Sequence, residues 1–192
     1  MRISVPALAV ACLLVIPARD GLNAAPTSPD TAVLEFLGFR AGARLDELAL
    51  HLRSSGGGKM RCRRSRVDLR VHECRAALNP EHPGGPVALW VSAIDSVAGV
   101  ITISAAVSPG QLEYWREGLE ARYGRVGARV QGVQWMLQWV RRGRMLRLTW
   151  RLERGGKVAS VSLVDGRVLD SWARSSVSTA NGTPSQPTSR TR

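Results

Sequence analysis

The sequence predicts an α+β domain in which helices pack on an antiparallel sheet. Two segments carry a single apolar stripe at helical spacing, and several others alternate apolar and polar residues with a period of two. Each half of the chain reads as one helix followed by strands. We therefore expect two helices packed on one face of a single antiparallel sheet, built as two helix-plus-strands repeats.

In the first half, a helix is expected at residues 44–53. Leu45, Leu48 and Leu52 recur at spacings of three and four and form one stripe. Three consecutive glycines at 56–58 end this helix. Period-two patterns then predict strands at residues 60–64, 67–76, 86–94 and 100–107.

In the second half, a helix is expected at residues 109–123. Ser108 is placed to cap it, Pro109 occupies its first position, and Gln111 completes a capping box. Gly124 then ends it. The apolar stripe of this helix consists of Leu112, Trp115, Leu119 and Tyr123. A three-stranded meander is expected at residues 135–139, 146–152 and 158–164, with residues 127–132 as a loop and Asp165-Gly166 as a final turn.

The first 25 residues have the pattern of a signal peptide. Arg2 precedes an apolar run at residues 3–16, and the stretch ends in Asn23-Ala24-Ala25, which favours cleavage. We therefore expect export to the periplasm or the extracellular space. Two alternatives are a lipid anchor on Cys12, which follows a faint lipoprotein box, and an uncleaved anchor helix.

The remaining chain reads as one domain between two low-complexity segments. Residues 26–33 are rich in Pro, Ser and Thr and are predicted to be a linker. Residues 34–172 are predicted to form the single α+β domain. From Ala173 to the end there are almost no apolar residues, which predicts a disordered tail at 173–192.

Cys62 and Cys74 are the only cysteines after the leader, and we predict that they form a disulfide. In an exported protein such a pair on neighbouring strands is most simply oxidised. A metal site built from these two cysteines with His72 and His82 is an alternative, although the spacing matches no standard zinc pattern. A Cys–His nucleophile is another, although a disulfide would consume its thiol.

Other familiar chemistries leave no trace in the sequence. It contains no G-x-S-x-G, no H-E-x-x-H and no Walker-type loop. Gly56-Gly57-Gly58-Lys59 follows a helix instead of preceding one, which is the wrong geometry for phosphate binding. We therefore expect no catalytic residue, metal or cofactor.

The formal net charge of +12 comes almost entirely from arginine. Such a balance attracts anionic partners, although it also serves solubility alone. Trp135, Trp139 and Trp150 lie on apolar faces of the last meander, either as core or as a partly exposed aromatic platform. The candidate anion-binding residues beside them are Arg141, Arg142, Arg144, Arg147 and Arg151.

The stretch Leu37-Gly38-Phe39-Arg40-Ala41-Gly42, leading into Leu45-Asp46-Glu47-Leu48, resembles the opening of small exported bacterial domains. The outer-membrane assembly lipoproteins of the small-protein A type and the beta-lactamase-inhibitor-protein fold look like this. The end of the second helix, Ala121-Arg122-Tyr123-Gly124, before a Trp-bearing strand is similar to exported proteins of that build. Arg44 departs from the Ser or Thr usual at the first helix cap. The resemblance implies a binding or envelope role.

Three functions follow as hypotheses. The first is an exported, non-enzymatic domain that binds a protein or envelope component through its sheet or strand edges. The second is an anion-binding module for glycan, lipid headgroup or nucleic acid that uses the Arg-rich meander. The third is a hydrolase with an unrecognised site.

Overall fold

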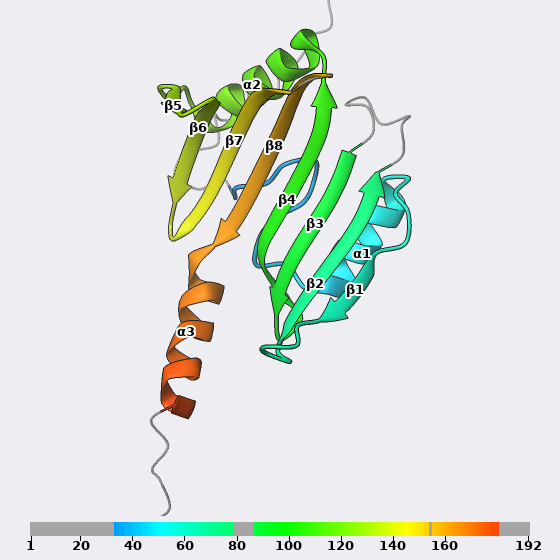
Figure 1. Cartoon of the computed structure of the whole chain (residues 1–192), viewed down its shortest axis with the longest axis vertical. Helices are drawn as coiled ribbons and strands as arrows, with labels where there is room; N and C mark the ends of the chain where they lie inside the picture. Colours follow the sequence, from blue (N-terminus) through cyan, green and yellow to red (C-terminus); the bar gives the residue numbers. More distant parts are fainter. Residues whose placement is uncertain (1–32, 79–86, 154, 181–192) are drawn as a thin grey trace, which may run out of the picture.

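The computed structural model describes residues 33–78, 87–153 and 155–180. The predicted signal peptide, all of the linker but Val33, His82 and residues 181–192 of the tail lie outside the described residues. The elements are α1 (Leu45–Ser54), β1 (Arg61–Arg64), β2 (Val71–Leu78), β3 (Val87–Ile94), β4 (Val97–Val107), α2 (Pro109–Tyr123), β5 (Arg129–Gln131), β6 (Gln134–Arg141), β7 (Arg144–Glu153), β8 (Gly156–Asp165) and α3 (Gly166–Ala180). Figure 1 shows their arrangement.

All strands of the described residues belong to one antiparallel sheet of eight strands in the order β1-β2-β3-β4-β8-β7-β6-β5. Each half of the chain supplies a helix and a four-stranded meander, and the halves meet where β4 pairs with β8. The order is palindromic about that pair, so β1 to β4 occupy places equivalent to β5 to β8. The sheet therefore repeats one plan twice, with short strands at both edges.

Helix α2 has the predicted boundaries, and its capping explains them. The Ser108 hydroxyl accepts a hydrogen bond from the backbone N–H of Gln111 at 3.1 Å, and Pro109 begins the helix. The predicted stripe is buried along its whole length. At its end, the Tyr123 hydroxyl accepts from the backbone N–H of Glu35 and lies 2.9 Å from the Glu35 carbonyl oxygen, so it holds the start of the domain.

Helix α1 lacks a side-chain cap and is held by backbone contacts instead. The N–H of Gly42 donates to the Ala98 carbonyl at 2.7 Å, and that of Leu45 donates to the Ser96 carbonyl at 2.9 Å. Leu48 and Leu52 are buried in the same core as the α2 stripe. These two backbone bonds to the β3–β4 hairpin hold the start of α1 in the absence of a side-chain cap.

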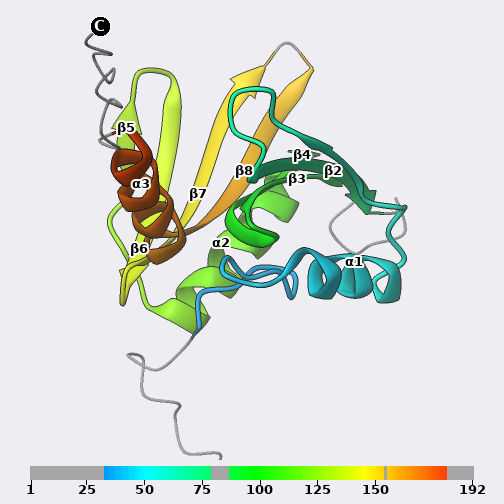
Figure 2. The same ribbon diagram turned by 90° about the horizontal axis from the view of Figure 1, so that it is seen from below.

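The predicted α+β class is confirmed in its coarse form, with three helices and an eight-stranded antiparallel sheet among the described residues. Within these residues, more positions lie in strands than in helices. The view from below in Figure 2 shows α1 and α2 close to the sheet, while α3 stands apart from these two helices.

Three sequence expectations about elements are wrong. The strand predicted from residue 67 begins only at Val71, because the Asp68 carboxylate accepts from the N–H of Arg70 at 2.9 Å and forms a turn. Residues 129–131, predicted as loop, form edge strand β5. Asp165-Gly166, predicted as a hairpin turn, starts helix α3.

Helix α3 also corrects the predicted start of the disordered tail, because it continues to Ala180. The Asp165 carboxylate accepts from the backbone N–H of Arg167 at 3.1 Å, which is the bond of a helix N-cap. Half-buried Val168, Leu169 and Trp172 recur at helical spacing, so the helix has an apolar side. The serine-rich composition after Ala173 did not indicate that the helix continues to Ala180.

Cys62 and Cys74 form a disulfide, which confirms the predicted pair. They are direct partners in the register of β1 and β2, with their Cα atoms 4.0 Å apart. Cys74 is buried and Cys62 is exposed. The bond fixes edge strand β1 to the sheet and leaves neither thiol for a metal or for nucleophilic chemistry.

Loss of this disulfide should lower the free energy of unfolding by about 3 kcal/mol, since it closes a loop of about a dozen residues. Urea denaturation of the oxidised and the reduced protein measures the difference. A Cys62→Ala/Cys74→Ala variant is the control, because its midpoint should not respond to the reductant. Equal midpoints for the oxidised and reduced wild-type chain would contradict this expectation.

Candidate functional site

The outer corner of the sheet at β5, β6 and β7 carries two stacked tryptophans. Trp135 on β6 is the register partner of Trp150 on β7, and their ring centroids lie 6.2 Å apart with planes 8° from parallel. Val130 on edge strand β5 pairs with Trp135 from the other side. The antiparallel register therefore brings residues of three strands into one aromatic and apolar row.

Exposed apolar side chains gather at this corner. Of the ten exposed large apolar residues among the described part of the chain, four lie here: Val130, Val133, Trp135 and Leu152. Trp135 is 48% exposed and Val133 is 82% exposed. Val133, Trp135 and Leu152 line a hollow of about 600 Å³ together with Trp150, Arg151 and Lys157. We call Val130, Val133, Trp135, Trp150 and Leu152 the aromatic corner.

The predicted alternatives for the tryptophans, core or platform, are both realised on one strand. Trp139 has the same orientation as Trp135 but is only 3% exposed, and its indole N–H donates to the Gly124 carbonyl at 2.7 Å. It lies beside Tyr123 at the end of α2. Helix α2 covers one end of β6, and the corner extends beyond that cover.

Three of the five candidate anion-binding arginines lie at the turn between β6 and β7. Arg141 donates to the Tyr123 carbonyl at 2.7 Å, and Arg144 forms an ion pair with Asp165 at 2.8 Å. Arg142 is exposed at the turn itself. Two of these three guanidinium groups thus serve the fold.

The other two arginines lie apart from that group along β7. Arg147, in the middle of the strand, donates to the side-chain oxygen of Gln138. Arg151, near the far end of the strand, forms an ion pair with Glu153 at 2.5 Å. The structure therefore distributes the five arginines along the meander and does not bring them together around one point.

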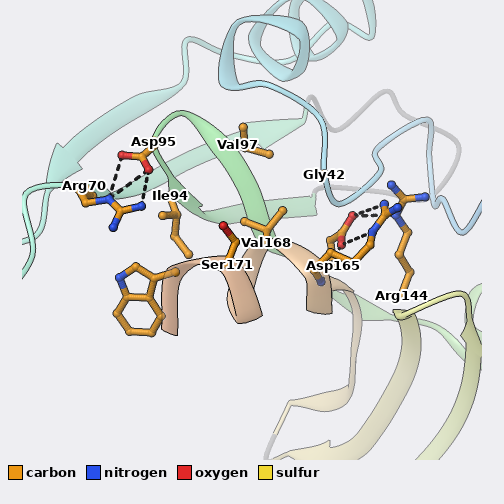
Figure 3. A pocket seen from close by; sticks show the side chains of 11 residues that line it. Gly42, Arg70, Ile94, Asp95, Val97, Arg144, Asp165, Val168 and Ser171 are labelled. Carbon is orange, nitrogen blue, oxygen red and sulfur yellow. Dashed lines mark hydrogen bonds and ion pairs between the residues drawn. The ribbon is translucent and has the colours of Figure 1, made fainter. Parts of the chain in front are cut away.

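A second hollow, of about 470 Å³, lies between α3 and the sheet and is shown in Figure 3. At one end, the Asp165 carboxylate is 1% exposed and accepts from Arg144 and Arg167 at 2.8 and 3.0 Å. Gly42 packs against it with a φ of +87°, and a Cβ there would lie 2.6 Å from an Asp165 oxygen. These contacts connect the loop before α1 with strand β7 and helix α3.

At the other end of the hollow, Arg70 binds both carboxylate oxygens of Asp95, with a shortest distance of 2.6 Å. The Arg70 guanidinium also donates to the Ser175 hydroxyl at 2.6 Å. The Trp172 indole N–H donates to the Asp68 carboxylate at 2.7 Å. These bonds tie α3 to the start of β2. Three arginines and two carboxylates, Asp95 and Asp165, line the hollow, and a third carboxylate, Asp68, contacts it through Trp172.

The environment lowers the pKa of all three carboxyl groups. Burial raises the pKa of Asp165, but the hydrogen bonds from Arg167 and Arg144 outweigh it and hold the pKa below the ordinary 3.8. The Arg70 bonds lower the pKa of Asp95, and the Trp172 and Arg70 bonds lower that of Asp68. The three groups are therefore ionised at neutral pH and are poor proton donors.

These lowered pKa values predict acid sensitivity. As the pH falls below 3.8, the unfolded chain takes up protons at these three positions before the folded chain does, so the stability that they contribute is lost. Urea midpoints should be flat near neutral pH and fall steeply below pH 4. An Asp165→Asn variant should show a shallower fall, and an unchanged slope would argue against Asp165 as a contributor.

The sequence reading missed this α3 cluster. Asp165 precedes Val168, Leu169 and Trp172, whose spacing is helical. The sequence therefore does contain the signal of a capped amphipathic helix. Arg70 and Asp95 are 25 residues apart and meet only through the pairing of β2 with β3. Nothing local in the sequence indicates their contact.

Comparison of the chain with protein-family models, curated proteins and solved structures finds no match. Within residues 33–78, 87–153 and 155–180, no helix is long and apolar enough to cross a membrane. The same residues contain no group of three or more His, Cys, Asp and Glu side chains placed to hold a metal ion.

Proposed function

We propose that the chain is an exported, non-enzymatic domain that binds an envelope protein through the aromatic corner. The observation that carries this proposal is the concentration of exposed apolar side chains around the Trp135–Trp150 stack. Contiguous exposed apolar surface of this kind marks interaction sites in proteins. Its position at the edge of the sheet agrees with binding through a sheet edge.

A protein partner suits the chemistry of the corner. Tryptophan is the residue most enriched at energetic centres of protein interfaces, and Trp135 offers a flat apolar ring with half of its surface accessible. Among the described residues, edge strand β5 pairs with a strand on one side only, and its other edge could pair with an extended segment of the partner. Arg151 and Lys157 supply a polar rim.

Two observations support the other parts of the proposal. The disulfide agrees with an oxidising, extracytoplasmic location. The carboxyl groups around the α3 hollow have lowered pKa values and arginine or tryptophan partners, which suits structural ion pairing better than general acid catalysis. The hydrolase hypothesis therefore draws no support from this hollow.

Site-specific photo-crosslinking in cells that produce the full chain tests the proposal. A photoreactive residue at Val133, 82% exposed in the corner, should give one adduct of discrete mass. The matched control is Leu50, 60% exposed on α1, which should give none. A Trp135→Ala substitution should reduce the Val133 adduct about tenfold or more, as expected for an interface centre. Equal labelling from both positions, or no adduct, would refute the proposed interface.

A further inference from the structure

The side of the sheet that faces away from the buried core carries a row of polar and aromatic side chains. Figure 1 looks onto this side, with α1 and α2 behind the strands. The register aligns six side chains across the strands, and each of them is exposed or half-buried. From β1 to β7 this outer row consists of Arg61, Arg75, Trp90, Thr102, Ser162 and Arg147.

The row begins with two arginines that directly oppose each other. Arg61 and Arg75 are register partners on β1 and β2. Neither forms an ion pair within the described part of the chain, whereas neighbouring Arg63 pairs with Glu73 at 2.8 Å. Like charges directly across two strands destabilise a sheet. A bound anion would offset that repulsion and gain two cationic contacts.

Trp90 continues the row beside these cations. It is the register partner of Arg75, and the two line a hollow of about 540 Å³. Small side chains, Ala88 and Ser104, line the hollow with them and leave room beside the indole. The site thus combines a flat apolar ring with an exposed guanidinium.

The far part of the row has hydroxyl groups and a third arginine. The hydroxyl oxygens of Thr102 and Ser162 lie 3.4 Å apart, and the Arg147 guanidinium is fixed by two bonds to Gln138. Arg75 on β2 and Arg147 on β7 are separated by four strand spacings, or about 19 Å. A single small anion cannot touch both, whereas an extended polyanion can.

We propose that the outer row binds an acidic polysaccharide, a sugar chain that bears carboxylate or sulfate groups. Its anionic groups would contact Arg61, Arg75 and Arg147, one sugar ring would pack on Trp90, and its hydroxyls would bond Thr102 and Ser162. The single aromatic ring and the central hydroxyls suit sugars better than nucleic acid, which uses several stacking rings. The disulfide also agrees with an extracytoplasmic ligand. This site is separate from the aromatic corner.

Fluorescence titration of the full chain with polygalacturonate tests the assignment, with dextran and single-stranded DNA as comparison polymers. An Arg61→Gln/Arg75→Gln variant should bind polygalacturonate about tenfold more weakly at low salt, and its salt slope should fall by about one per arginine. The matched control is Arg53→Gln/Arg125→Gln, which removes the same charge at exposed positions outside the row. It should bind as the wild type does.

Thermal unfolding of both double variants verifies that they fold. The proposal predicts binding to polygalacturonate, little binding to dextran, and a Trp135→Ala variant that binds the polymer normally. Equal losses in the two double variants would reduce the effect to net charge and overturn the site. Tighter binding to DNA, with the same dependence on Arg61 and Arg75, would overturn the polysaccharide assignment, and so would no binding to any polymer.

Discussion

Replacement of Asp165 by alanine is expected to lower the free energy of unfolding by about 4 kcal/mol, roughly 3 from leaving Arg144 unpaired and roughly 1 from loss of the helix cap. The Asp165 carboxylate is buried and accepts hydrogen bonds from Arg144 and Arg167. It is also the N-cap of α3. One side chain therefore joins β7, the entry to α1 and the last helix.

A double-mutant cycle separates the ion pair from the rest of that effect. An Asp165→Ala/Arg144→Met variant should recover part of the lost stability, because it removes the unpaired charge together with its partner. Urea denaturation followed by circular dichroism measures all members of the cycle. Strictly additive losses would show that Arg144 and Asp165 are not energetically coupled.

The same substitution should have a local effect on α3. Its cap and its Arg167 contact are lost, while the Arg70–Ser175 and Trp172–Asp68 bonds remain. Hydrogen exchange should therefore speed up first in the turn after Asp165. Unchanged exchange in that turn would contradict the role of Asp165 as a cap.

The fold was readable from the sequence wherever local signals and packing agree. Helix α2 has a hydroxyl cap, a proline at its first position and a complete apolar stripe, and its predicted boundaries are those observed. The strands of both meanders alternate in the way that one buried face requires. The sequence also indicated that a helix followed by strands occurs twice. The sheet order agrees, because β1 to β4 and β5 to β8 occupy equivalent places on either side of the central pair.

The errors arose where tertiary contacts override composition. Helix α3 runs into a serine-rich stretch, and contacts with Asp68 and Arg70, about a hundred residues away in the chain, hold it. The outer row was likewise hidden, because Arg61, Trp90 and Arg147 come together only through the register of the sheet. The sequence showed the arginines of the meander but not that Asp165 and Glu153 already neutralise two of them.

Replacement of Trp139 by alanine should be strongly destabilising, with a loss of about 4 kcal/mol. The ring is buried between α2 and the sheet, and its N–H bond to the Gly124 carbonyl would be left unmade. A Trp139→Phe variant keeps most of the packing and should lose about 1 to 2 kcal/mol, because the hydrogen bond is lost and the ring is smaller. Chemical denaturation gives both values.

Trp135→Ala is the matched comparison, on the same strand and the same face. Trp135 is half-exposed, so its removal should cost about 1 kcal/mol, mainly through the lost stack with Trp150. For partner binding, the proposed function requires the opposite order. Trp135→Ala should abolish binding, whereas Trp139→Phe should leave the affinity nearly unchanged. If Trp135→Ala were as destabilising as Trp139→Ala, the corner would be core, and the argument from its exposure would fail.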